Sequence, residues 1–150
     1  MAKYSIDGQD TNTAATTILG VDAGTTARRG KVYDLIVGSD ATPADNASEL
    51  NLQRYTVDGT ATAVTPQALD PADAAALAEA GEAHSVEPTY TANAILLNIM
   101  LNQRATFRWV AAPGGELVYP ATADNGLGLT SITVAGSAVN TGATIHFEEQ

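Results

Sequence analysis

Short runs of β-forming residues alternate with turn-forming residues along most of this sequence, and this alternation is its most restrictive feature. KVYDLIVG at 31–38 and LNLQRY at 50–55 are rich in Val, Ile, Leu and Tyr, and the segment between them is rich in Asp, Pro, Asn and Ala. Asp58-Gly59 adds a strong hairpin signal. About nine such runs fit the chain, a spacing typical of a β-sandwich or barrel. The sequence therefore predicts an all-β domain, an antiparallel β-sandwich.

The most apolar segment is NAILLNIML at 93–101. Its length suits either a strand or two helical turns. Ile95, Leu97, Ile99 and Leu101 share one face at a period of two residues, and the neighbouring segments favour β structure. A strand is therefore predicted here. The same alternation predicts a final strand over 143–147 with three inward side chains, Ala143, Ile145 and Phe147.

One short helix is expected among the strands, over 70–81. Asp70 is a good N-cap residue, and Pro71 suits the first helical position. Residues 74–80 are mostly strong helix formers, and Gly81 is a suitable stop. A helix this short and alanine-rich needs support from the body of the protein.

Residues 1–30 differ in character from the rest. Residues 9–30 are rich in Thr, Ala and Gly and carry few large apolar side chains beyond Ile18, Leu19 and Val21. We expect residues 1–30 to be an N-terminal arm, a swapped strand or the first strands, possibly extended. Residues 31–150 are expected to form the β-sandwich domain.

Charge and composition exclude several classes of protein. The chain has 7 basic and 17 acidic residues and a formal net charge of −10, which argues against non-specific binding to nucleic acid. It has no cysteine, so disulfides and cysteine-based zinc sites are excluded. No signal peptide is recognisable at the N-terminus, and the longest apolar run is too short to span a bilayer. No membrane partner is expected.

No pattern typical of an active site is present. The two histidines, His84 and His146, are distant in sequence and are expected in a solvated loop and on a strand surface. The sequence has no G-x-S-x-G motif and no phosphate-binding glycine loop. The acidic segment 40–46 lacks the ligand spacing of a calcium loop. We therefore expect no enzyme activity, no metal and no cofactor.

The stretch 104–129 holds the only tryptophan and two turn signals. Phe107 and Trp109 share one face of a short strand, and we expect both to be core anchors. Two turns are expected at one end of the sandwich as contact loops, formed by Pro113, Gly114 and Gly115 and by Asn125 and Gly126.

Three blocks of the sequence carry a resemblance to a known class of protein. Residues 33–56 (YDLIVGSDATPADNASELNLQRYT), residues 63–129 and the terminal ATIHFEE at 143–149 resemble the decoration, or cement, proteins of tailed-bacteriophage heads. The resemblance implies a sandwich or jelly-roll-like body without catalytic residues. It further implies a virion protein, made in the host bacterial cytoplasm, that binds the major capsid protein on the capsid surface as a homodimer or homotrimer. Edge strands and loops would make the contacts.

Two other functions remain open. A carbohydrate-binding β-sandwich module is the main alternative by analogy of fold, and it would present exposed aromatic side chains. A small enzyme on a jelly-roll scaffold is the second, although metal chemistry on such a scaffold needs clustered histidines.

Overall fold

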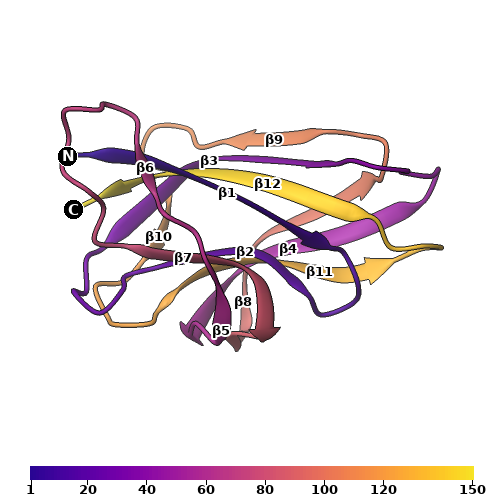
Figure 1. Cartoon of the computed structure of the whole chain (residues 1–150), viewed down its shortest axis with the longest axis horizontal. Coiled ribbons are helices and arrows are strands. Elements are labelled where there is room, and N and C mark those ends of the chain that lie inside the picture. The colour runs from indigo at the N-terminus through magenta and orange to yellow at the C-terminus, as the bar shows by residue number, and fades with distance from the viewer.

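Two antiparallel six-stranded sheets pack face to face in the computed structural model, which describes residues 1–150 (Figure 1). Sheet 1 has the order β10-β3-β12-β1-β6, with β9 also paired to β3, and sheet 2 has the order β5-β7-β2-β11-β4-β8. The strands of sheet 1 are β1 (Lys3–Thr11), β3 (Gly30–Ser39), β6 (Gln67–Ala68), β9 (Phe107–Val110), β10 (Leu117–Tyr119) and β12 (Asn140–Glu149). Those of sheet 2 are β2 (Thr17–Asp22), β4 (Ala47–Val57), β5 (Thr60–Ala63), β7 (Glu79–Val86), β8 (Thr89–Asn102) and β11 (Gly126–Val134).

The strand order is that of a jelly roll. The chain changes sheet at each of its first three connections, and the last two strands return between the first four, with β12 between β1 and β3 and β11 between β2 and β4. β9 and β10 pair with successive parts of the same edge of β3, so they act as one interrupted strand. The β5–β7 segment is an insertion that widens both sheets. The predicted antiparallel β-sandwich is confirmed, and its topology matches the double Greek key of jelly rolls.

The core lies between the sheets and follows the period-two pattern of the strands. In β12 the inward side chains are buried and the outward ones are half-buried, as predicted for Ala143, Ile145 and Phe147. β8 is a strand, as predicted, and Leu97 and Ile99 pair with the buried Leu52 and Leu50 of β4. A register shift at Leu96 turns Ile95 outward, which the simple alternation did not anticipate.

The predicted helix over 70–81 is wrong. Asp70 does cap a turn, accepting the amide of Ala72 at 2.9 Å, but only one turn forms. The following backbone groups bond to distant partners instead of to one another: the Ala74 carbonyl accepts the hydroxyl of Tyr4, and the Ala78 amide donates to Glu149. From Glu79 onward the chain pairs with β2. Sheet pairing therefore overrides the helix propensity of alanine. The structure contains no helix of the length and apolar character needed to cross a membrane.

Residues 1–30 supply the first strands of the sandwich rather than an arm. β1 pairs with β12 over nine residue pairs, and all six residues of β2 are buried. Ile18, Leu19 and Val21 are completely buried in the common core. The small residues of this segment are what permit such close packing, since a Cβ at Gly8 would lie 2.9 Å from the side chain of Leu19.

Candidate interaction surface

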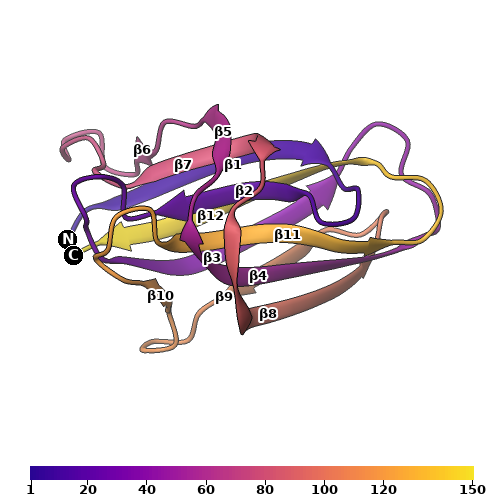
Figure 2. The same cartoon turned by 90° about the horizontal axis from the view of Figure 1, so that it is seen from below.

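Two free sheet edges lie on the same side of the sandwich. β8 ends sheet 2, and β9 with β10 ends sheet 1, while the inserted strands β5, β6 and β7 lie on the opposite side (Figure 2). We call the side formed by β8, β9 and β10 the open side. It exposes unpaired backbone groups from both sheets along one flank of the molecule.

β8 is a long edge strand with no protecting charge. It runs for 14 residues, from Thr89 to Asn102, and contains no Lys, Arg, Asp, Glu or Pro. Natural sheets normally guard such edges with charged residues, prolines or very short strands. Its pairing with β4 is regular from Leu97 to Asn102, and three register shifts interrupt the pairing of the residues before Leu97.

Apolar side chains are exposed along this edge. Met100 is 75% exposed and Ile95 is 47% exposed, and both lie on the outer face of sheet 2. Leu96, Leu97 and Leu101 are half-buried and pack against the core. The edge therefore offers both unpaired backbone groups and apolar surface.

Phe107 and Trp109 lie on the open side. They pair with Val37 and Leu35 of β3, face inward and pack against the core, but both are only half-buried. The fully buried aromatic side chains are Tyr119 and Phe147 instead. Tyr119 is the last residue of the three-residue strand β10, which is too short for sequence alternation to give a signal. The glycine opposite, Gly30, makes room for its ring.

The two expected contact loops differ in character. Pro113, Gly114 and Gly115 are exposed in the loop that connects β9 and β10, on the open side. Asn125 is half-buried, and its amide donates to the carbonyl oxygens of Ala123 and Thr56. Gly126 is buried at the start of β11. Of the predicted contact residues, only those of the first loop are exposed, although residues 120–124 of the second loop are exposed as well.

A charged cluster lies on the outer face of sheet 1 next to the open side. Arg108 of β9 binds the carboxylate of Asp34 with two nitrogen atoms, Nε at 3.0 Å and Nη2 at 2.6 Å. His146 places Nδ1 3.3 Å from the same carboxylate. The hydrogen bonds from Arg108 hold the pKa of Asp34 below its usual value. Arg108 and Asp34 form the only ion pair between an arginine or lysine and a carboxylate in the molecule. The contacts of Asp34 with Arg108 and His146 tie β9 to β3 and β12.

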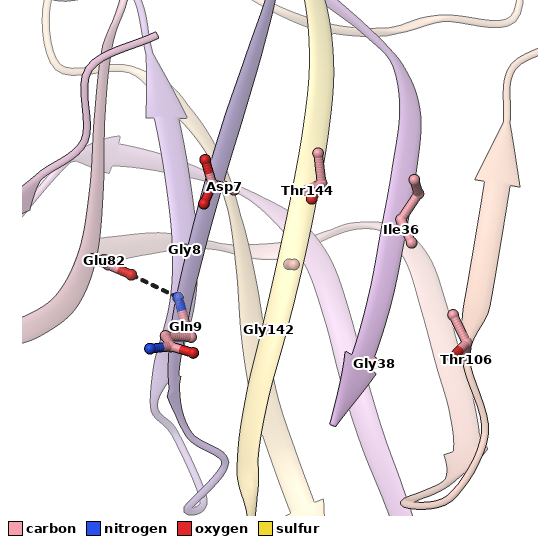
Figure 3. A pocket seen from close by; sticks show the side chains of 10 residues that line it. Asp7, Gly8, Gln9, Ile36, Gly38, Glu82, Thr106, Gly142 and Thr144 are labelled. Carbon is pink, nitrogen blue, oxygen red and sulfur yellow. Dashed lines mark hydrogen bonds between the residues drawn. The ribbon is translucent and has the colours of Figure 1, made fainter. Parts of the chain in front are cut away.

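A shallow groove of about 460 Å³ crosses the outer face of sheet 1 (Figure 3). Gly38 and Gly142 form part of its floor, and Asp7, Gln9 and Thr144 line it with polar groups. At one end Glu82 of β7 accepts the Gln9 amide at 2.6 Å, the bond drawn in Figure 3. These side chains offer hydrogen-bonding groups along the groove.

A smaller cavity of about 160 Å³ lies between β5, β7 and the ends of β2 and β4. Asp22 in its wall is 4% exposed, and burial raises its pKa to about 6. Its two carboxylate oxygens accept hydrogen bonds from the Tyr55 hydroxyl and the Gly24 amide. Burial lowers the pKa of His84, whose Nδ1 has no partner. Both carboxylate oxygens of Asp22 are therefore hydrogen-bonded within the protein, which gives Asp22 a structural role between strands.

No three His, Asp or Glu side chains come together in a geometry that could hold a metal ion. Comparison with protein-family models, with curated proteins and with solved structures finds no match to this chain.

Proposed function

We propose that this chain is a virion structural protein: a decoration protein that binds the outside of a tailed-phage capsid as a homodimer. One observation carries the proposal, the long uncharged edge of β8 on the open side. The jelly-roll topology and the sequence resemblance support it by analogy, because jelly rolls recur in viral capsid proteins.

The unpaired backbone groups of the β8 edge favour pairing with another strand. An exposed, apolar and uncharged edge strand invites pairing with another chain. Leaving it free favours aggregation, whereas covering it with a specific partner satisfies its backbone groups. Exposed Met100 and Ile95 add apolar area beside the backbone groups.

The partner at this edge is a second copy of the chain. Each copy carries a net charge of −10, so approach through most faces is opposed by repulsion. β8 itself carries no charged residue, so pairing along this edge brings no two charges of β8 together. Two antiparallel β8 strands related by a two-fold axis form an isologous contact, in which a residue i of one strand meets a residue j of the other and j meets i.

A dimer of this kind suits attachment to a lattice. It presents two identical surfaces, which can engage two neighbouring capsid subunits at once. Weak contacts repeated in this way gain strength through effective concentration. The stability of the capsid would rise because the dimer bridges capsomers.

The β8 contact is tested by the mass of the protein in solution. Light scattering is expected to give a dimer for the native chain and a monomer for the double variant Ile95→Lys/Met100→Lys. Val86→Lys is the matched control, because Val86 is 58% exposed on β7, away from the open side. Circular dichroism checks that each variant folds. A native monomer, a trimer, or a dimeric double variant would contradict the contact.

Capsid attachment is tested by co-sedimentation with expanded phage capsids that lack decoration protein. The native chain is expected to sediment with these capsids and to raise their thermal stability. The monomeric double variant is expected to bind more weakly because it has lost bivalency. Failure of the native dimer to bind capsids of any tailed phage tested would count against the proposal.

The groove of sheet 1 favours one alternative, a carbohydrate-binding module. Its polar lining suits hydroxyl groups. Tyr33 lies on the same face of sheet 1, and its ring centroid is 6.1 Å from that of His146, with the two rings tilted. A glycan array distinguishes the two functions. Saccharide binding that Asp7→Ala abolishes would favour this alternative, and an array without hits removes it.

A further inference from the structure

A pocket of about 530 Å³ opens at the ends of β4, β10 and β11. Its walls come from the β2–β3 loop, the end of β4, the start of β8 and the connection between β10 and β11. This pocket is separate from the groove of sheet 1 and from the Ile95–Leu101 part of the β8 edge. Of its lining residues, the sequence analysis singled out Asn125 and Gly126, as an expected contact loop, and the proposed function uses none of them.

The pocket gathers positive charge in a strongly acidic protein. Arg29 and Arg54 both line it, although the whole chain has only 7 basic residues against 17 acidic ones. No carboxylate lines it, whereas the sheet 1 groove carries Asp7 and Glu82. Neither Arg29 nor Arg54 forms an ion pair. The two guanidinium groups are therefore uncompensated.

Arg54 is held in place for binding. It follows Leu50 and Leu52 on the inward row of β4, and its Nη2 donates to the Val118 carbonyl oxygen of sheet 1 at 3.2 Å. That bond bridges the two sheets and fixes the guanidinium, which is half-buried. A guanidinium has five N–H donors, so most remain available to a ligand. Partial burial of a cation without a neighbouring anion costs desolvation free energy, and a bound anionic ligand would offset that cost.

Arg29 approaches from the β2–β3 loop. Its side chain is exposed, while its carbonyl oxygen accepts the Gln150 amide at 2.9 Å, which anchors the backbone. Val118, Pro120 and Ala121 also line the pocket and supply its apolar part, with Val118 directly beside Arg54. The pocket thus combines two fork-shaped donors with an apolar surface.

We infer that this pocket binds an organic anion, with a carboxylate or phosphate head held by Arg29 and Arg54 and an apolar body against Val118, Pro120 and Ala121. Arginine suits such heads because its planar fork donates two parallel hydrogen bonds to oxygen atoms. The volume accommodates a ligand larger than an inorganic ion, so the apolar wall contributes to affinity.

Titration calorimetry with phenyl phosphate, benzoate and benzyl alcohol tests the site. At least one of the two anions is expected to bind the native protein with a dissociation constant below about 1 mM, and neutral benzyl alcohol is expected not to bind. The anion that binds with the lower dissociation constant identifies the head group as phosphate or carboxylate. Absence of binding by both anions at millimolar concentration, or equal binding of benzyl alcohol, would overturn the inference.

Variants locate the site. Arg29→Gln is expected to lower the affinity for the anion about tenfold, which corresponds to the loss of roughly one charge-assisted contact. Arg54→Gln is expected to lower this affinity at least as much. Circular dichroism checks that the variant folds. Arg104→Gln is the control and is expected to leave affinity unchanged, because Arg104 lies outside the pocket. Unchanged affinity in Arg29→Gln would overturn the assignment. The dimer test at β8 is independent of these results.

Discussion

The hydroxyl of Tyr55 donates a hydrogen bond of 3.0 Å to the carboxylate of Asp22, and both residues are buried. Tyr55 belongs to β4 and Asp22 to β2, with β11 between them. The phenol ring crosses over Gly126 of β11, where a Cβ would lie 2.5 Å from the ring. The pair therefore links two strands across a third, and the glycine makes the crossing possible.

The first expectation concerns the pH dependence of folding. Burial raises the pKa of Asp22 from 3.8 to about 6, so the folded protein binds this proton more tightly than the unfolded chain does. The resulting stabilisation is complete below the unfolded pKa and is lost as the pH rises through about 6. Asp22→Asn is neutral at all pH values. It should gain stability relative to the native protein between pH 4 and 7, by on the order of 3 kcal/mol.

Urea unfolding of both proteins across this pH range measures the effect. The two proteins differ only at position 22, so the pH dependence of the difference between their free energies of unfolding reports the effect of the Asp22 carboxylate. A difference that does not change with pH would show that Asp22 has an ordinary pKa.

The second expectation concerns the other tyrosine that crosses β11. Tyr90 reaches the Thr17 hydroxyl at 2.7 Å, and its own hydroxyl fills the space that a side chain at Gly128 would need. Gly128→Ala should therefore destabilise the protein by about 1–3 kcal/mol through overpacking. Tyr90→Phe removes the atom in conflict, so the double variant should lose less than the sum of the two single variants. Additive losses in a double-mutant cycle would contradict this packing.

The third expectation concerns Arg108 and Asp34. Asp34 has a side chain only 5% exposed, and the hydrogen bonds from Arg108 lower its pKa. A lowered pKa stabilises the fold above the unfolded value, and that stabilisation is lost as the pH falls. Arg108→Gln should therefore lower the unfolding midpoint at pH 7, and the loss should shrink towards pH 3. Arg104→Gln, whose Nε makes only a 3.4 Å bond to the Pro43 carbonyl, should change little at either pH.

Local pattern was sufficient for much of this fold. The outward and inward residues of β12 follow from strict alternation, because that strand lies in the middle of sheet 1 with one face in the core. The interleaving of β11 and β12 among the first strands could not be derived in the same way. It depends on pairings between residues more than a hundred positions apart, such as Ile6 with Ile145.

Local pattern failed where distant contacts decide the conformation. Asp70 and the alanines after it favour a helix, but Tyr4, Glu149 and β2 bind that segment instead. The arginine pocket was equally invisible, because Arg29 and Arg54 lie on separate strands or loops with no shared motif. Phe107 and Trp109 were placed on the correct face, while their half-exposure depends on β9 being an edge strand.

The fourth expectation compares two buried tyrosines. Tyr55 donates to Asp22, whereas the Tyr119 hydroxyl is completely buried and has no hydrogen-bond partner. Replacement by phenylalanine removes the same atom in both cases. Tyr55→Phe should destabilise the protein by about 1–2 kcal/mol, because it leaves a buried carboxylate with one fewer donor. Tyr119→Phe should be neutral or stabilising by up to about 1 kcal/mol, because it removes a polar group that gains nothing from burial. Urea unfolding at pH 7 compares them directly, and an equal loss in both variants would show that the Tyr119 hydroxyl has a partner in solution.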